Sequence, residues 1–191
     1  MRIVLQRVKS ASVLVDGAVV GAIDTGLVLL LGFSVFDCAG GSGEALQHLA
    51  RKVLAARVFP KDGKQWAGSA ASLGLPILLI SQFTLHGNLR KPKPDFHKSA
   101  GTEAARQLWE EAVATFKAQH GEEKVQTGIF AADMEVRLAN WGPVTLTYDT
   151  ANRKESYWEE LAGTSDGATG SAGGGSSGGV KAEEGGLSGR E

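Results

Sequence analysis

The pattern of hydrophobic and polar positions predicts a β-rich domain with two main helices over the first 150 residues. Runs rich in leucine and β-branched residues, bounded by Gly or Asp, are typical of strands. Strands are expected at 3–8, 12–15, 19–23, 27–33, 76–83, 134–138 and 144–148. Asp16-Gly17 predicts a hairpin turn between two of them. Helical spacing of apolar residues predicts one helix over 42–57 and a second that starts after Thr102 and ends before Gly121.

This order of elements indicates an α/β fold in which curved, mostly antiparallel, barrel-like β-sheets are closed by the two helices. The composition changes near Ala151, after which Gly, Ser and Ala dominate. Such a segment has too little apolar surface to offset the entropy of ordering its backbone. We therefore expect one domain at 1–150 and a mostly disordered tail at 151–191.

Charge, cysteine content and hydropathy narrow the class of protein. The chain has 20 basic and 21 acidic residues, but residues 1–150 hold 16 basic and 14 acidic ones, a net +2. Any contact with nucleic acid must therefore be local. A single cysteine, Cys38, excludes an internal disulfide and fits a reducing compartment. No secretory signal pattern is seen, and the longest apolar run, Leu27 to Phe33, is too short to span a membrane. A cytoplasmic protein without a membrane partner is expected.

No familiar catalytic motif is present. The four histidines are not in a metal-ligand spacing, and no nucleophile elbow, phosphate loop or dinucleotide fingerprint is found. We expect no metal and no cofactor, and Cys38 is more simply an incidental thiol. Two classes remain at this point: a binding module, or an enzyme whose catalytic groups belong to its backbone or to its substrate.

Three segments narrow this choice: Gln6-Arg7-Val8, Ser81-Gln82-Phe83-Thr84-Leu85, and Asn140-Trp141-Gly142-Pro143-Val144-Thr145. Together they resemble the D-aminoacyl-tRNA deacylase family, and the similarity runs from Met1 to about Asp149. The resemblance implies hydrolysis of the ester bond of D-aminoacyl-tRNA, which releases free D-amino acid and tRNA. It also implies a homodimer whose active site lies at the subunit interface. The residues implied to form this site are Ser81, Gln82, Phe83, Thr84, Gly142 and Pro143.

In this family the Gly-Pro peptide is cis and enters the pocket of the partner subunit. Its carbonyls occupy the place where an L-amino acid would put its side chain, so the L-isomer is excluded by a clash. From sequence alone, a trans hairpin loop at Gly142-Pro143 is the alternative. Glycine has no side chain and would escape this filter, so glycyl-tRNA, including glycine mischarged on tRNA-Ala, is an expected second substrate.

For the chemistry, the resemblance implies that backbone amides around Phe83 and Thr84 hold the reacting carbonyl and that the 2′-hydroxyl of the terminal adenosine helps to activate water. A rival mechanism uses the Thr84 hydroxyl as nucleophile, although no His or Lys is adjacent in sequence to activate it.

Further residues are assigned supporting or binding roles by the resemblance. Arg7 would fix the Gly142-Pro143 loop through its planar fork of donors. Phe130 and Met134, together with Gln82, would lie near the terminal adenosine. From the residues themselves, a Pro-stiffened basic loop indicates phosphate contacts, and a merely solvated loop is the equal alternative; its cations are Arg90, Lys91, Lys93 and Lys98.

The sequence departs from the family pattern at Lys91, where Gly is usual, and at Trp141, where Asp is common. Two other functions compete with the deacylase: a non-catalytic nucleic-acid-binding protein that uses the basic loop, and a general esterase for small D-amino acid derivatives. The first is disfavoured because a pure binder would not need both the Gln-Phe-Thr and the Gly-Pro segments. The second is disfavoured by the lack of a side-chain nucleophile.

Overall fold

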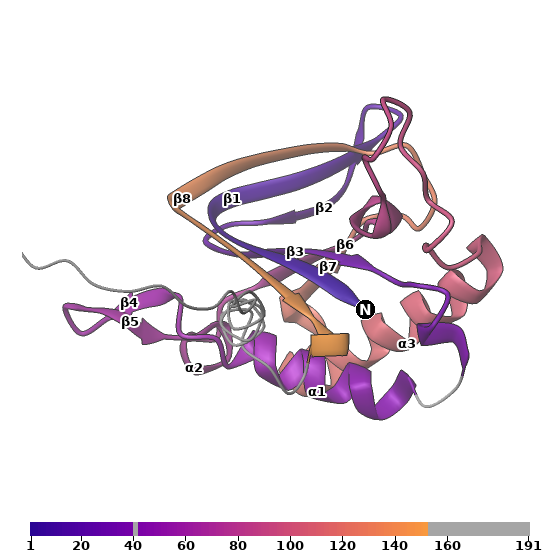
Figure 1. Cartoon of the computed structure of the whole chain (residues 1–191). Coiled ribbons are helices and arrows are strands. Elements are labelled where there is room, and N and C mark those ends of the chain that lie inside the picture. Colours follow the sequence, from indigo (N-terminus) through magenta and orange to yellow (C-terminus); the bar gives the residue numbers. More distant parts are fainter. Residues whose placement is uncertain (40–41, 153–191) are drawn as a thin grey trace, which may run out of the picture. The chain divides into compact units, whose positions relative to one another are not determined.

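A computed structural model describes residues 1–39 and 42–152 of the chain. The predicted disordered tail therefore lies, apart from its first two residues, outside the described residues. Within the described part the elements form one six-stranded sheet, a separate two-stranded hairpin and a layer of helices (Figure 1).

The first strand organises the sheet. Strand β1 (Arg2–Val15) pairs antiparallel with β2 (Ala18–Ile23) and β3 (Gly26–Gly32) along one edge, and with β8 (Glu135–Asp149) along the other. The turn between β1 and β2 has positive φ at both central residues, 50° at Asp16 and 80° at Gly17. This is the conformation that a two-residue hairpin requires, so the predicted Asp16-Gly17 turn is confirmed.

The sheet continues from β3 through two parallel neighbours. Strand β6 (Ile77–Ser81) pairs with β3, and β7 (Val125–Thr127) pairs with β6. Figure 1 shows β1 and β8 curling over β3, β6 and β7, so the sheet approaches a barrel. The predicted α/β class, with a curved and mostly antiparallel sheet, is confirmed.

Both faces of the central strands are buried, which explains their continuous apolar runs. Leu27, Leu29 and Leu79 point into a core shared with the helices. Val28 and Leu78 point the opposite way, into a second core enclosed by the curled part of the sheet. A strand covered on two sides needs hydrophobic side chains at consecutive positions rather than at alternate ones.

Helices α1 (Ser42–Leu54) and α3 (Thr102–His120) cover one face of the sheet, as predicted. Helix α1 is three residues shorter than expected, because after Leu54 the chain turns and buries Val58 and Phe59. Pro60 also disfavours a helical conformation at the residue before it. Helix α3 ends at His120, and its C-cap residue, Gly121, has a φ of 105°.

The sequence prediction missed several short elements. These are the two-stranded hairpin of β4 (Phe59–Lys61) and β5 (Lys64–Gly68), helix α2 (Ala70–Leu73), strand β7 and four 3-10 turns, η1 (Asp37–Ala39), η2 (Phe83–His86), η3 (Glu122–Lys124) and η4 (Thr150–Asn152). The strand predicted over 76–83 is also too long, because β6 ends at Ser81 and Phe83 begins η2.

Two pairs of predicted strands are each one continuous strand. The strands expected at 3–8 and 12–15 are both part of β1, and those at 134–138 and 144–148 are both part of β8. The Trp141–Val144 segment forms a wide bulge within β8, because Thr145 pairs with Gln6 and Asn140 already pairs with Val8. Proline is tolerated there because a bulge releases residues from the hydrogen-bond ladder. Among the described helices, none is long and apolar enough to cross a membrane.

Candidate active site

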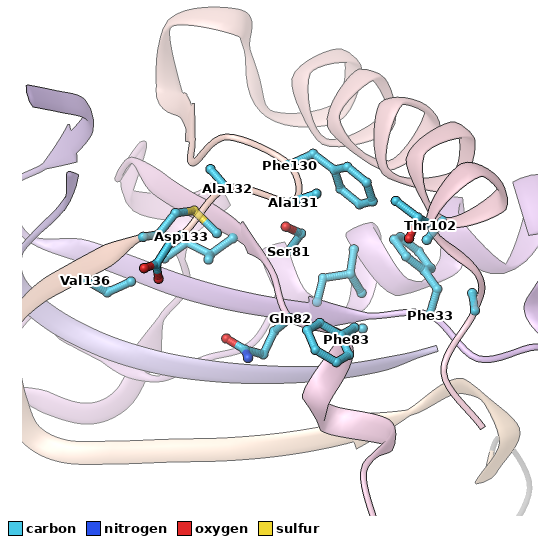
Figure 2. Close-up of a pocket in the computed structure, with 16 residues that line it drawn as sticks. Phe33, Ser81, Gln82, Phe83, Thr102, Phe130, Ala131, Ala132, Asp133 and Val136 are labelled. Carbon is cyan, nitrogen blue, oxygen red and sulfur yellow. The ribbon is translucent and has the colours of Figure 1, made fainter. Parts of the chain in front are cut away.

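A pocket of about 450 Å³ opens where the carboxyl ends of β3 and β6 meet α3 and the segment before β8. Figure 2 shows Phe130 beside α3 and Thr102 at the start of this helix on one side of the cavity, with Asp133 and Val136 on another. Ser81 and Gln82 leave the end of β6 between them. The residues that line the pocket are Leu31, Gly32, Phe33, Ile80, Ser81, Gln82, Phe83, Ala100, Thr102, Ala105, Phe130, Ala131, Ala132, Asp133, Met134 and Val136.

Gly32 allows the chain after β6 to pass close to the end of β3. A Cβ atom at this position would lie 2.6 Å from the carbonyl oxygen of Gln82 and 3.1 Å from Cβ of Leu85. The Gln82 amide also donates a 2.8 Å hydrogen bond to the Leu31 carbonyl. These contacts fix the direction in which the chain leaves β6 and enters η2.

The start of η2 lies at the pocket, with Phe83 in its lining and Thr84 next to it in the chain. A 3-10 helix bonds each N–H to the carbonyl three residues earlier, and the first such bond joins the Leu85 amide to the Gln82 carbonyl. The amides of Phe83 and Thr84 therefore have no partner within this helix. The Gln82 side-chain amide donates to the Thr84 hydroxyl at 2.5 Å, and Phe83 packs edge-to-face on Phe96 at 5.1 Å.

Phe130 and Met134 form part of the opposite wall of the pocket. The Phe130 ring lies 6.4 Å from the ring of Trp109 and 4.9 Å from the guanidinium carbon of Arg106. Met134 is half-buried and its sulfur faces Gly128, where a Cβ atom would lie 2.6 Å away. Between them Ala131 has a φ of 61°, which turns the chain towards the cavity. An apolar wall with one ring face suits a flat heterocycle.

Arg7 forms a second cluster that includes Gly142. Its side chain is buried, with Nε donating to the Trp141 carbonyl at 2.9 Å and Nη1 donating to the Val58 carbonyl. The guanidinium carbon also lies 4.5 Å from the centre of the Trp141 ring. A Cβ atom at Gly142 would lie 2.5 Å from Nη2 of Arg7. Arg7 therefore contacts Trp141 and lies against Gly142, while its role in the site stays a prediction.

The Gly142-Pro143 peptide is trans, as are the other peptide bonds of the described residues. The expectation of a cis bond is wrong for this structure. Trans is the lower-energy isomer of an X-Pro bond, and Gly142 makes the turn through a φ of 114° instead. Gly142 and Pro143 are both exposed and do not line the pocket of their own chain.

The predicted residues are thus divided among three places. The pocket contains Ser81, Gln82, Phe83, Phe130 and Met134, and Thr84 is the next residue after Phe83 within η2, outside the lining. The β8 bulge holds Gly142, Pro143 and the contact with Arg7. The basic residues Arg90, Lys91 and Lys93 are exposed on a loop closed by an Asn88–Asp95 bridge, and Lys98 is exposed just after it; all four lie outside the pocket lining.

Sequence reasoning missed some of the pocket residues. Gly32, Thr102 and Asp133 line the cavity without any recognisable motif. All three lie within the stretch that resembles the family, but none belongs to the three segments that carry the resemblance. Gly32 and Thr102 sit at element ends, where only the three-dimensional arrangement shows their position.

The pocket lining has no paired nucleophile and base. Ser81 and Thr102 supply hydroxyls and Asp133 supplies a carboxylate, but no histidine or lysine lines this cavity. Partial burial and the neighbouring Asp37 raise the pKa of the Cys38 thiol, so it is not an activated thiolate. Within residues 1–39 and 42–152, no three His, Cys, Asp or Glu side chains lie close enough together to hold a metal ion.

His86, at the end of η2, couples the stability of this region to pH. Its Nε2 lies 3.2 Å from the carbonyl of Gly32, and burial lowers the pKa of His86 below 6.5. The unfolded chain therefore binds this proton more readily than the folded chain, and the free energy of unfolding falls as the pH drops below about 6.5.

We expect His86→Gln, whose amide can still donate to Gly32, to flatten the decline of the free energy of unfolding between pH 7 and pH 5. Urea unfolding across this range measures the effect, and equal slopes for the two proteins would exclude His86 as its cause.

Comparisons with known proteins agree with this geometry. Residues 4–149 match the model of a family described as D-Tyr-tRNA(Tyr) deacylase. A D-aminoacyl-tRNA deacylase of Yarrowia lipolytica is 41% identical over 158 residues, which cover 81% of this chain and 100% of that protein. One of Picosynechococcus sp. is 45% identical over 148 residues, which cover 76% of this chain and 94% of its own.

Solved structures show the same fold. A structure named c-Myc DNA Unwinding Element Binding Protein has a TM-score of 0.73 and 37% identity, and the match covers 78% of this chain and 98% of that one. A second, described as a probable eukaryotic D-amino acid tRNA deacylase, has a TM-score of 0.70 with the same coverages, and its 20% identity supports the fold alone. The family model and the full-length relatives carry the assignment. This chain therefore belongs to the D-Tyr-tRNA(Tyr) deacylase family.

Proposed function

We propose that this protein hydrolyses the ester bond of D-aminoacyl-tRNA and thereby removes D-amino acids from tRNA. The observation that carries the proposal is the family match over residues 4–149, with relatives named D-aminoacyl-tRNA deacylase that are aligned over nearly their full length. The expected cytoplasmic location follows from this substrate and stays a prediction.

The pocket is assigned to the acylated end of the tRNA. Its volume of about 450 Å³ lies in the range of small-molecule sites. The Phe130 ring and Met134 offer an apolar face for the terminal adenine, and Gln82 offers polar edges on the opposite wall. Ser81 lies between them at the end of β6, where the ester would reach the start of η2.

The proposed chemistry uses backbone donors and the RNA itself. Water adds to the ester carbonyl carbon, and the amides of Phe83 and Thr84 stabilise the oxyanion that forms. A well-placed donor of this kind contributes about 3 kcal/mol. The tetrahedral intermediate then expels the ribose oxygen, which leaves with a proton as a hydroxyl group. The neighbouring 2′-hydroxyl orients the water, because the pocket lining offers no side-chain base other than Asp133.

Thr84→Ala distinguishes this mechanism from one in which the Thr84 hydroxyl is the nucleophile. We expect the variant to keep kcat within about fivefold of the parent protein, since its amide remains in place and only the contact with Gln82 is lost. Single-turnover release of D-tyrosine from tRNA measures the rate. A loss of a thousandfold or more in a correctly folded variant would support the nucleophile mechanism.

Chiral selection is assigned to the Gly142-Pro143 segment of a second copy of the chain. Both residues are exposed and lie outside their own pocket, so they are available to enter that of a partner. Strand β8 pairs only with β1 among the described strands, and it exposes Val136, Leu138 and Leu146. A 15-residue edge strand with exposed apolar side chains is suited to be covered by another copy.

Two details of specificity complete the proposal. A main-chain wedge rejects an L-side chain by steric clash, but it leaves glycine unaffected. Hydrolysis of glycyl-tRNA, including glycine on tRNA-Ala, is therefore expected. We assign the binding of tRNA phosphates to four exposed cations, Arg90, Lys91, Lys93 and Lys98. Such electrostatic contacts carry no sequence preference.

A non-catalytic nucleic-acid-binding protein is the second candidate. One observation favours it, because the 37%-identical solved structure is named a DNA unwinding element binding protein.

One simple assay distinguishes the two functions. Protein is incubated with D-tyrosyl-tRNA, L-tyrosyl-tRNA and a free D-tyrosine ester, and release of tyrosine is followed with time. We expect release from D-tyrosyl-tRNA alone. No release from any substrate, with retained binding of duplex DNA, would favour the second candidate. Analytical ultracentrifugation of the same sample checks the dimer.

A further inference from the structure

The β4–β5 hairpin carries a cluster of exposed side chains that the proposed function does not use. Figure 1 shows β4 and β5 extending away from the six-stranded sheet. Arg57, Lys61 and Lys64 are exposed on or beside this hairpin, with Asp62 at its tip as the only acidic residue between 57 and 68. Among the described residues, no carboxylate forms an ion pair with any of these three cations.

The hairpin register places two of these charges side by side. Lys61 pairs directly with Lys64 across the Asp62-Gly63 turn, so the two side chains project from the same face. Like charges at directly opposed positions destabilise a hairpin. Their Cβ atoms are about 5 Å apart in such a pair, and two long, flexible ammonium groups can then reach neighbouring phosphates of one nucleic acid strand.

Trp66 adds an exposed aromatic ring to these charges. Its indole is 57% exposed, although burial of a large ring would stabilise the fold. Its φ is 57°, a left-handed conformation that is rare for a bulky side chain and lies next to the irregular register of β5. Proteins that bind single-stranded nucleic acids use exposed aromatic rings to stack on bases and neighbouring cations to contact phosphates.

The base of the hairpin is fixed to the segment proposed to select chirality. Arg7 donates to the Val58 carbonyl just before β4 and to the Trp141 carbonyl just before Gly142. The ring of Phe59, in β4, lies 6.1 Å from the ring of Trp141. Lys9 extends the positive charge towards the bulge, with its ammonium 3.6 Å from the centre of the Trp141 ring. The hairpin and the Gly142-Pro143 bulge therefore form one connected unit.

We propose that the β4–β5 hairpin is a tRNA-binding arm, in which Lys61 and Lys64 bind backbone phosphates and Trp66 stacks on an unpaired base of the substrate. The inference rests on the proposed function for the identity of the RNA. A subunit that presents its Gly142-Pro143 segment to the acyl group would then also hold the body of the same tRNA.

The test measures binding of uncharged tRNA, which requires no catalysis. Lys61→Ala/Lys64→Ala should weaken binding about tenfold and reduce the slope of log K against log salt by about 1.4 to 1.8, for two phosphates lost. The matched control is Lys117→Ala/Lys124→Ala, which removes the same charge from lysines that pair with Glu122 and Glu123. The control should leave both quantities nearly unchanged. Equal effects of the two double variants would overturn the assignment.

Trp66→Gly tests stacking without the ambiguity of a folding defect. Glycine adopts positive φ freely, so the melting temperature should be equal or higher, while tRNA binding should weaken at least about fivefold. Trp66→Tyr keeps a stacking ring and should keep most of the affinity. Unchanged binding by Trp66→Gly would remove the ring from the site. Duplex DNA of similar length, bound with the same dependence on the hairpin, would overturn the assignment to RNA.

Kinetics separate this inference from the proposed function. The hairpin variants should raise KM for D-tyrosyl-tRNA and leave hydrolysis of a short D-aminoacyl-adenosine unchanged. If the parent protein hydrolyses D-tyrosyl-tRNA and the variants are indistinguishable from it, the hairpin inference fails alone. If the parent protein hydrolyses nothing but still binds tRNA through the hairpin, the proposed function fails and the arm stands.

Discussion

Arg7→Ala is expected to lower kcat/KM for D-tyrosyl-tRNA about a hundredfold and to destabilise the protein by about 3 kcal/mol. The guanidinium is buried and joins the carbonyls of Trp141 and Val58. Hydrogen bonds from a charged donor contribute about 1.5 to 3 kcal/mol each, and removing the donor leaves its acceptors without partners. The bulge that contains Gly142 would then lose its main support, so that the Gly142-Pro143 segment, proposed above to select chirality through a fixed backbone, becomes mobile.

Two variants serve as controls for this prediction. Lys9→Ala removes a cation from the same Trp141 ring but leaves both Arg7 hydrogen bonds in place, so its effect should stay near 0.5–1 kcal/mol. Arg7→Lys keeps the charge but lacks the planar fork that reaches two carbonyls, and it should resemble Arg7→Ala in activity. The assay compares single-turnover rates on D- and L-tyrosyl-tRNA with urea unfolding. Unchanged rates on both substrates would show that Arg7 has only a structural role.

The elements predicted well from sequence are those whose signal is strong and local. Asp16-Gly17 fixes a two-residue hairpin through its backbone preferences, and both residues have the positive φ that this turn demands. The buried runs of β3 and β6 are equally clear, because both faces are covered and every position is apolar. Fold class followed from these runs and from the apolar spacing of α1 and α3.

The β4–β5 hairpin shows why a similar signal can be missed. Asp62-Gly63 is the same dipeptide as Asp16-Gly17 and also has positive φ at both residues, 49° and 74°. Its flanking strands are short, and β5 carries an exposed Trp66 rather than an alternating apolar pattern. The hairpin is anchored by Phe59 and by the contact of Arg7 with the chain before β4, and these are long-range interactions that no local pattern contains.

The candidate site could be predicted from sequence only through resemblance. Ser81, Gln82 and Phe83 are unremarkable strand-end residues, and their position beside Phe130 depends on the pairing of β6 with β3 and on the packing of α3. Arg7 alone would be read as a solvated strand arginine. Its burial follows from the wide bulge of β8 opposite it, which places four residues of one strand across from a single residue of the other. Such a bulge is set by the pairing of β1 with β8, which the local sequence does not contain. Gly142 and Pro143 therefore predict a loop between two strands.

Gly142→Ala is expected to disrupt the Gly142-Pro143 segment, which is proposed above to select chirality. The residue has a φ of 114°, which side chains rarely adopt, and the new Cβ would lie 2.5 Å from Nη2 of Arg7 and 3.3 Å from Cγ2 of Val144. The guanidinium is the end of a flexible side chain, but it is buried and held by two carbonyls and cannot move away without losing these bonds. We expect a destabilisation of about 2 to 4 kcal/mol, from backbone strain together with a disrupted hydrogen-bond cluster. Deacylation of D-tyrosyl-tRNA should fall more than tenfold.

Gly17→Ala is the matched control, because Gly17 also has positive φ, 80°, but a Cβ atom there would meet nothing within 4 Å. It should show only the backbone strain, about 1 kcal/mol, and full activity. The difference between the two variants isolates the clash with Arg7 from the conformational penalty. Adding Arg7→Ala to Gly142→Ala should then cause less further loss than Arg7→Ala causes in the parent protein, because the two changes disrupt the same contact. Strictly additive free energies of unfolding in this double-mutant cycle would contradict the proposed coupling between the arginine and the bulge.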